Sequence, residues 1–572
     1  MNFITRFPRT FLTLVAIVAL LPGIFELPLM DRDEPRFSHA TIEMMDRNDW
    51  VVPYFNDEYR FDKPPLTYWW MRLHYTMFGK HEFAARLHSS LSAWLIALLV
   101  FAIGGRIGLN VERSALAGAM WLCSFQVLIH GRMAVADMPL ILFLVLSQWS
   151  QWEMLQKRDG KVFGQWFWIF HLSTALGFLA KGPLAYAIPL LTLLLYTITA
   201  ILSQSRECMA CYKTIGCTLL GVPLSLGIVA LWGVPAMLQT DYQYFDVGIG
   251  THVVERATTS MNNRKVVYWI YLVYMFPFLL PWSSQLTRTV HAGMADTIRP
   301  EVGRYLLSWF VSSFCIFSFM KTQLPHYILP GYPAFMLLLA HLVGVHYQPR
   351  MVGRILGRAV CLVSLVLAFV LLFACSLCPT VGEVAPMKGL FGALAALMFF
   401  LSLAAFVVYC NRPASGWQAI FLTLLASLCM IPAGHYARKA HATVRLMEHL
   451  SPDRATKRAA WKYQEGSLIW YPSDFWILGN PDQNPEFAEA DEMVFQVKRW
   501  RVDDQFIDDV LAKVAPRPVD DYTERVNAYL EKFEVQEVAR LQGWNPGSSS
   551  WVELIVAKRS SEPSSQDSVT TP

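Results

Sequence analysis

Long apolar runs dominate this chain from residue 9 to residue 434. A helix needs about 20 apolar residues to cross the hydrocarbon core of a bilayer, and scanning on that basis predicts about 13 spans. They fall at roughly 9–29, 84–103, 113–130, 138–153, 164–180, 183–203, 214–234, 266–284, 304–320, 327–346, 358–378, 389–410 and 416–434. Charged residues make up only 16% of the sequence, whereas soluble proteins carry about 25%. The sequence therefore predicts an α-helical polytopic membrane protein.

Lysine and arginine collect on alternate loops between these spans. If the N-terminus is cytoplasmic, each loop on that side is basic, through Arg106, Arg113, Lys157, Arg158, Lys161, Arg206, Lys213, Arg288, Arg299, Arg304, Arg350, Arg354, Arg358 and Arg412. The opposite side receives the C-terminal region and the loops 30–83, 131–137, 235–265 and 321–326. Because cytoplasmic loops carry the excess of positive charge, we predict a cytoplasmic N-terminus and an extracytoplasmic C-terminal region.

The C-terminal part of the chain differs in composition from the rest. Residues 1–434 are predicted to form the membrane domain, and residues 435–559, which mix charged residues with tryptophan, a separate small α/β domain. Strand-like patterns at 467–471 and 551–557 and a helical pattern at 520–533 support this prediction. Residues 560–572 are rich in Ser, Thr and Pro and are predicted to be disordered. The net charge of +4 and the lack of a basic surface interleaved with aromatics argue against a nucleic-acid partner.

The loop 30–83, directly after the first span, concentrates charge at a membrane boundary. Asp33, Glu34 and Arg36 stand together there, and charges in such a place are costly unless they pair or act. The apolar spacing over 37–49 predicts a helix that lies along the membrane interface.

Lys63 is the second notable charge of this loop. It precedes Pro64 and Pro65, which restrict the backbone to an extended turn and present the lysine rigidly at headgroup level. An alternative interpretation treats these charges as ordinary juxtamembrane residues and the aromatics beside them as an interfacial belt, namely Tyr68, Trp69 and Trp70.

Several sequence islands carry a resemblance to a known family. They include D-E-P-R at 33–36, K-P-P-L-T-Y-W at 63–69, A-K-G-P at 180–183 and K-T-Q-L-P-H-Y-I-L-P at 321–330, with further matches at 49–53, 78–86 and 131–139. In these islands the chain resembles the aminoarabinose transferases of lipid A, which belong with the protein O-mannosyltransferases in the GT-C superfamily. The resemblance covers much of the membrane part. It is specific for the superfamily and less specific for the sugar or the acceptor.

The resemblance implies roles for particular acidic residues. Such enzymes take a sugar from a polyprenyl phosphate, so a carboxylate orients or deprotonates the acceptor. This role falls to Asp33, with Asp137 as a second catalytic carboxylate and with Glu34 and Arg36 in support. A carboxylate at a helix N-terminus is also favoured by the helix dipole alone, which is the alternative explanation for both aspartates.

Cations are needed to hold the departing phosphate. The candidates implied by the resemblance are Lys63, Lys181, Arg256 and Tyr327. Lys181 lies at a membrane boundary, where snorkelling is the alternative explanation. Arg264 and Lys265 are alternatives to Arg256, and Tyr327 is alternatively a belt tyrosine.

A metal site is a further implication of the resemblance. Asp62 and His81 match the positions of metal ligands in the aminoarabinose transferases. Two such residues do not hold zinc without further ligands. A structural divalent ion is therefore the most that these positions suggest, and no cofactor is required for the chemical step.

Taken together, the motifs predict a glycosyltransferase of the bacterial inner membrane that works on its periplasmic face. The predicted reaction moves 4-amino-4-deoxy-L-arabinose from undecaprenyl phosphate to lipid A. This lowers negative surface charge and the binding of cationic peptides such as polymyxin. Alternatives are another sugar, such as mannose or an amino hexose, with core oligosaccharide or protein as acceptor. A transporter or flippase for lipid-linked sugars predicts charges at mid-helix and internal repeats, and neither stands out here.

Overall fold

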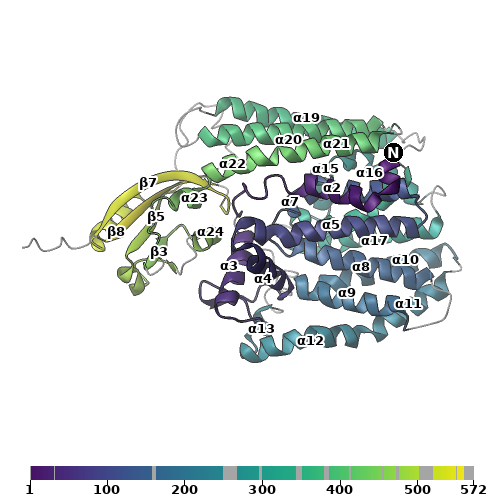
Figure 1. Ribbon diagram of the computed structural model, residues 1–572, viewed down its shortest axis with the longest axis horizontal. Helices are drawn as coiled ribbons and strands as arrows, with labels where there is room; N and C mark the ends of the chain where they lie inside the picture. Colours follow the sequence, from purple (N-terminus) through teal and green to yellow (C-terminus); the bar gives the residue numbers. More distant parts are fainter. Residues whose placement is uncertain are drawn as a thin grey trace, which may run out of the picture.

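The structure is a computed structural model of the 572-residue chain. It describes residues 2–559 except for 31, 157–162, 206, 249–266, 295–298, 343–350, 379–384, 411, 413, 454–455, 472–475, 502–519 and 549. A layered helical part carries a smaller sheet-containing part at one end (Figure 1). The predicted tail 560–572 and the candidate Arg256 lie outside the described residues.

Seven helices within these described ranges are long and apolar enough to cross a membrane. They are α5 (Glu82–Arg106), α10 (Leu184–Leu202), the joined α11 (Cys208–Leu220) and α12 (Val222–Gln239), α17 (Pro300–Phe319), α19 (Met351–Leu377), α20 (Ala385–Cys410), and the joined α21 (Ser415–Leu428) and α22 (Met430–Ala440). The chain is a multi-pass membrane protein.

Two further apolar runs form continuous helices over the predicted residues, α8 (Asp137–Gln156) and α9 (Gln165–Lys181). Other runs form helices shorter than the sequence predicted, namely α2 (Pro8–Leu20), α6 (Val111–Leu122), α7 (Phe125–His130), α15 (Ile270–Phe278) and α18 (Tyr332–Leu342). Hydropathy sums composition over a window and is blind to breaks in the backbone. A broken helix is tolerated at membrane depth where protein surrounds it, and α6 and α18 are buried over most of their length. The total of about 13 crossings stays a prediction.

Close packing of α5 against α6 lies behind the outer loops. A Cβ atom at Gly118 would lie 2.7 Å from the carbonyl oxygen of Ala97, so only glycine permits this approach of the two backbones. The indole of Trp121 is fully buried and donates to the carbonyl of Ala93 at 2.9 Å. α5 also holds the short segment 131–136 that follows α7, because Ser90 Oγ donates to the carbonyl of Gly131 at 2.6 Å and His88 Nε2 lies 3.1 Å from the carbonyl of Val135.

The first outer loop folds into a compact unit beside the helix ends. It contains α3 (Asp33–Asp46), the hairpin of β1 (Tyr54–Phe55) and β2 (Glu58–Tyr59), and α4 (Leu66–Phe78). The helix predicted over 37–49 begins four residues earlier, so that Asp33 is its first residue. It is also more enclosed than an interfacial helix, because residues on several of its sides are buried.

The C-terminal region is built around a mixed sheet with the order β4-β3-β5-β8-β7, and β6 pairs with β5. The strands are β3 (Arg458–Trp461), β4 (Trp476–Leu478), β5 (Glu492–Arg501), β6 (Asp520–Asp521), β7 (Val535–Asn545) and β8 (Ser550–Arg559). The helices are α23 (Ala442–Leu446), α24 (Gly466–Trp470) and α26 (Thr523–Lys532). Parallel pairs join β3 to β4 and β5, and antiparallel pairs join β8 to β5 and β7.

Two local predictions in this region can be compared with these elements. The strand predicted at 551–557 lies within β8, and the helix predicted at 520–533 corresponds to α26, preceded by β6. The strand predicted at 467–471 is wrong, because this segment forms α24. All five residues of α24 are buried, and a short, fully buried apolar run shows no periodicity that separates strand from helix.

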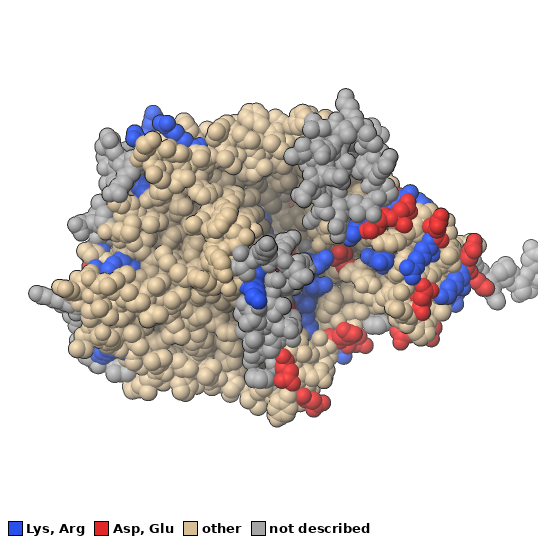
Figure 2. Space-filling model, turned by 180° about the vertical axis from the view of Figure 1, so that it is seen from behind, with Lys and Arg blue, Asp and Glu red and all other residues tan. Residues whose placement is uncertain are grey.

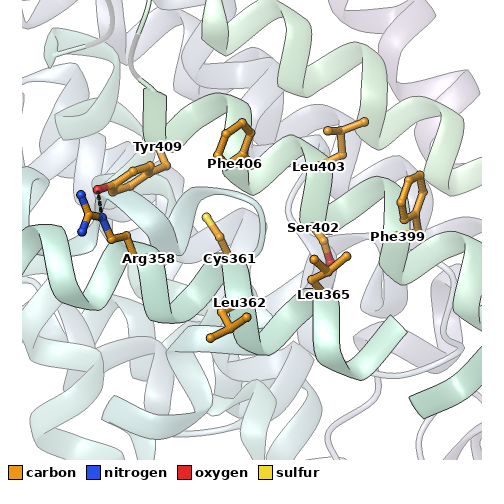
Figure 3. Close-up of a pocket in the computed structure, with 9 residues that line it drawn as sticks. All are labelled: Arg358, Cys361, Leu362, Leu365, Phe399, Ser402, Leu403, Phe406 and Tyr409. Atoms are coloured by element: carbon orange, nitrogen blue, oxygen red, sulfur yellow. Dashed lines mark hydrogen bonds between the residues drawn. The ribbon is translucent and has the colours of Figure 1, made fainter. Parts of the chain in front are cut away.

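The pair α19 and α20 forms an outer layer of the helical part (Figure 1). Between them runs an apolar hollow lined by Leu362, Phe399 and Phe406, with Arg358 and Tyr409 at one end (Figure 3). The Arg358 Nε donates to the Tyr409 hydroxyl at 3.2 Å. Only 17% of the most apolar stretch of α19 is buried, against 50% for α20, so α19 presents most of its side chains to the lipid.

Candidate active site

Asp33 opens α3 beside three cationic or hydroxyl side chains from other segments. Its carboxylate is exposed and interacts electrostatically with Arg60, Tyr68 and Lys181. Among the described residues, none donates a hydrogen bond to this carboxylate. The position of the Asp33 side chain therefore follows from the position of α3. Asp33 is within electrostatic range of Lys181, and its predicted catalytic role stays a prediction.

Lys63 lies in an adjoining network on the loop before α4. Its Nζ is 2.7 Å from Oδ1 of Asp62, and the other oxygen of Asp62 is 3.0 Å from Nη2 of Arg60. Arg60 also donates through Nε to the hydroxyl of Tyr68 at 3.1 Å. Burial raises the pKa of Tyr68 to about 12, so its hydroxyl stays protonated. Arg60 is a site cation that the sequence reasoning missed, although it stands only three residues before Lys63.

A second cluster surrounds Lys181, the last residue of α9. Its Nζ is 2.5 Å from Oδ1 of Asp137, the first residue of α8, and lies 5.5 Å from the ring centroid of Tyr327. His326 Nε2 is 3.5 Å from the same Asp137 oxygen, and the centroid of the His326 ring lies 4.7 Å from that of the His130 ring, with the two planes tilted by 41°. Burial lowers the pKa of His326 to about 3, so this contact involves a neutral imidazole.

Three sequence islands meet in this cluster. Asp137 comes from the 131–139 island, Lys181 from 180–183 and Tyr327 from 321–330. Lys181 contacts both of the others, and the roles predicted for the three residues stay predictions. The sequence reasoning missed His130 and His326. Both lie within or directly beside the islands, which was the available signal, but nothing in a linear sequence shows that their rings meet.

Glu34 has a different environment from its neighbour Asp33. It is fully buried and forms a two-pronged ion pair with the fully buried Arg86 of α5, at 2.8 and 2.9 Å. Its oxygens also accept the backbone N–H groups of Met30 and Ala134, at 2.8 and 2.7 Å. Arg86 donates in addition to three backbone carbonyls, those of Ile24, Leu27 and Pro28. The predicted supporting role of Glu34 is therefore to hold α3 against the membrane helices.

Arg36 is half-buried one turn after Asp33. Its Cγ faces Gly466 of the C-terminal region, where an added Cβ would lie 3.2 Å away. Among the described residues no ion pair of Arg36 is recorded, so its supporting role stays a prediction.

The two suggested metal ligands are engaged elsewhere. The carboxylate of Asp62 pairs with Arg60 and Lys63. His81 caps the N-terminus of α5, where Nδ1 accepts from Ala84 N at 3.3 Å and Nε2 contacts the Phe78 carbonyl at 2.9 Å. The described part of the chain holds no group of three or more His, Cys, Asp or Glu suited to a metal. With these contacts, Asp62 and His81 do not fit a metal centre.

Comparison with known proteins places this geometry in context. The model of the dolichyl-phosphate-mannose-protein mannosyltransferase family matches residues 10–245. An undecaprenyl phosphate-alpha-4-amino-4-deoxy-L-arabinose arabinosyl transferase of Edwardsiella ictaluri (strain 93-146) is 30% identical over 346 residues, which cover 59% of this chain and 60% of that protein. The protein of the same name from Serratia proteamaculans (strain 568) is 29% identical over 329 residues, 57% of each chain. These matches span about 60% of the relatives' length.

The crystal structure of ArnT from Cupriavidus metallidurans bound to undecaprenyl phosphate superposes with a TM-score of 0.68 at 18% sequence identity, covering 96% of this chain and 98% of that one. The chain has the ArnT fold. The predicted helical membrane part with a small C-terminal α/β region is thereby confirmed. Because the superposition covers 96% of the chain, the C-terminal region is included in the ArnT fold.

Proposed function

We propose that this chain is a glycosyltransferase that moves a sugar from a polyprenyl phosphate to an acceptor. The observation that carries the proposal is that Asp33 lies within electrostatic range of both Arg60 and Lys181. One carboxylate and two cations, one from its own loop and one from the end of α9, thus lie in one region of the molecule. This is what transfer away from a phosphate leaving group requires, since an acceptor must be oriented and the released charge must be stabilised.

The proposed reaction breaks the bond between the anomeric carbon and the donor phosphate oxygen. A bond forms between that carbon and an acceptor oxygen, and the polyprenyl phosphate leaves with the electron pair. Asp33 orients the acceptor oxygen and takes its proton where it carries one. Lys63, Lys181 and Arg60 stabilise the charge that develops on the phosphate.

In this proposal Asp137 acts through Lys181. Its carboxylate lies at salt-bridge distance from the lysine and also contacts His326. The carboxylate is therefore engaged by these two side chains, so we do not assign it to the acceptor. The ring of Tyr327 lies beside the same ammonium group, an arrangement that favours a localised cation. We therefore assign Asp137 and Tyr327 to positioning Lys181 for the phosphate.

For the substrates, we propose undecaprenyl phosphate carrying 4-amino-4-deoxy-L-arabinose as donor and lipid A as acceptor. The names of the relatives and the lipid bound in the ArnT crystal structure support this donor. We place the reaction at the periplasmic face of the inner membrane, with a cytoplasmic N-terminus. In Figure 2 the visible charges at the end away from the C-terminal region are blue, in keeping with the positive charge of cytoplasmic loops.

Mass spectrometry of lipid A tests this proposal. Lipid A from cells that carry the gene should include species with an added amino pentose, and these should vanish on deletion and return on complementation. Polymyxin sensitivity should rise in the deletion strain, because lipid A regains negative charge. An unchanged lipid A profile in the deletion strain would refute lipid A as acceptor, and a different mass increment would identify another sugar.

Replacing Lys63 by alanine is expected to raise the donor KM by about tenfold to a hundredfold, the range for a lost hydrogen bond to a charged group. Asp62 keeps Arg60 as its partner in this variant, so the loop should stay folded. Steady-state kinetics of the purified protein with synthetic donor would measure the effect. The matched control is Lys80→Ala, since Lys80 pairs with Asp46 on the same outer loop. Equal donor KM values in the two variants would exclude a phosphate-binding role for Lys63.

A further inference from the structure

The C-terminal region is docked onto the first outer loop through contacts that fix register. The side-chain amide of Asn56 bonds both the backbone N–H and the carbonyl of Trp476, each at 3.1 Å. The Tyr471 hydroxyl accepts from Leu29 N at 3.0 Å. A two-sided amide contact of this kind tolerates little sliding, so the two parts meet in one defined arrangement.

The helix α24 lies directly against α3 in this interface, as the adjacent ribbons in Figure 1 show. Trp470 shares a buried apolar cluster with Phe37 and Ala40 of α3, and its ring stacks on Tyr75 of α4 at 6.1 Å. α24 therefore completes a small core whose other members come mainly from α3 and α4, with Ala84 and Ala85 of α5 and Ala134 and Ala136 beside them.

Gly466, at the start of α24, covers the first turn of α3. A Cβ atom added there would lie 3.2 Å from Cγ of Arg36, 3.4 Å from Cβ of Pro35 and 3.5 Å from the carbonyl oxygen of Arg32. These three residues surround Asp33 in the sequence. One methyl group at position 466 would be tight only against Cγ of Arg36 and in ordinary contact with Pro35 and Arg32, so a larger side chain is needed to displace the turn.

An ion pair also crosses this boundary, but it contributes little. Arg32 Nε lies 3.8 Å from Oε2 of Glu465, and the arginine side chain is 58% exposed. Exposed pairs at such distances are weakened by solvent and by side-chain entropy. The packing of Trp470 therefore contributes most of the stabilisation between α24 and α3, and the lack of a side chain at Gly466 allows the two helices to approach closely.

We propose that Gly466 and Trp470 are positioning residues for sugar transfer: the C-terminal region seats the first turn of α3 and thereby places Asp33 toward the cations of the site. The inference rests on the proposed function. Its physical basis is that the Asp33 side chain is exposed and accepts no hydrogen bond from the described residues. The position of its carboxylate therefore depends on where α3 lies. Glu34 and Arg86 hold α3 from the membrane side, and α24 holds it from the other.

A graded series at position 466 tests this inference in the full-length protein. Gly466→Leu is expected to lower kcat about tenfold to a hundredfold, because displacement of a reacting group by about 1 Å has effects of that size. The donor KM should stay unchanged, since Lys63 and Lys181 lie on other elements. Gly466→Val should fall between wild type and Gly466→Leu. The matched control is Ala488→Leu, an added side chain at an exposed position of the same region.

Hydrogen exchange of the backbone amides at 33–37 gives a readout that needs no substrate. It should be faster in Gly466→Leu than in Ala488→Leu, while the melting temperature of both variants stays near that of wild type. Unchanged kcat and exchange in Gly466→Leu would overturn the proposal, as would equal increases in exchange throughout the protein. If Gly466→Leu does not fold, unchanged values in Gly466→Val would overturn it instead. A wild-type protein without transferase activity would refute the proposed function, and the exchange data would still decide whether α24 seats α3.

Discussion

Replacing Asp33 by asparagine is expected to lower sugar transfer by about 10²- to 10⁴-fold, the usual contribution of a positioned acid or base. Asparagine keeps the size of the side chain but removes the negative charge that faces Arg60 and Lys181. Because Asp33 is exposed, the fold should be unaffected. The rate would be measured with purified protein and synthetic donor, and in cells by the fraction of modified lipid A.

Asp46→Asn is the matched control for this variant. Asp46 ends the same helix and pairs with Lys80 at 2.8 Å, where both side chains are partly exposed. It should therefore retain near wild-type activity. An Asp33→Asn protein that modifies lipid A as fully as Asp46→Asn would show that Asp33 is only a favourable residue for the helix dipole.

Replacing Arg86 by leucine is expected to destabilise the protein by about 3–5 kcal/mol, the cost of leaving a buried charge without its partner. Glu34 would lose both bonds from the guanidinium, and three carbonyls at the end of the first span would lose their donor. The melting temperature in detergent and the yield of folded protein would report the loss. Arg525→Leu is the control, since the half-exposed Arg525 pairs with the similarly exposed Asp482.

A double variant separates two explanations of this loss. If the ion pair alone matters, Arg86→Leu combined with Glu34→Leu should recover most of the stability, since apolar replacement of a whole buried pair is often neutral. We expect no recovery. The carbonyls of Ile24, Leu27 and Pro28 and the N–H groups of Met30 and Ala134 would remain without partners, and each such buried group carries its own desolvation cost. Recovery of wild-type stability would contradict the view that this pair joins three chain segments.

Much of the candidate site was predictable because its residues stand at the ends of apolar runs. Asp33, Lys63, Asp137, Lys181 and Tyr327 were all selected on that basis or by family motifs. The structure brings Lys181, Asp137 and Tyr327 into contact and puts Asp33 within electrostatic reach of Lys181. Charge at a membrane boundary is rare, so each such residue is conspicuous in the linear sequence.

Other parts of the site were not predictable. Glu34 and Asp33 are neighbours, yet one is buried beside Arg86 and the other is exposed, because consecutive residues of a helix point to different sides. Asp62 and His81 were matched to a metal by position, whereas their contacts in the structure are with Arg60, Lys63 and backbone groups. Which partner a polar side chain finds depends on segments far away in the chain.

By itself, the sequence determined that this chain lies in a membrane, which of its loops carry the positive charge, and which boundary residues are candidates for chemistry. Apolar length and charge are local properties, and the bilayer acts on them directly. Only the tertiary structure decided that Glu34 joins Arg86 and that α24 rests on α3, where Gly466 meets the turn of Asp33. These contacts join residues separated by 52 and by more than 400 positions, and their energy comes from burial that exists only once the chain has folded.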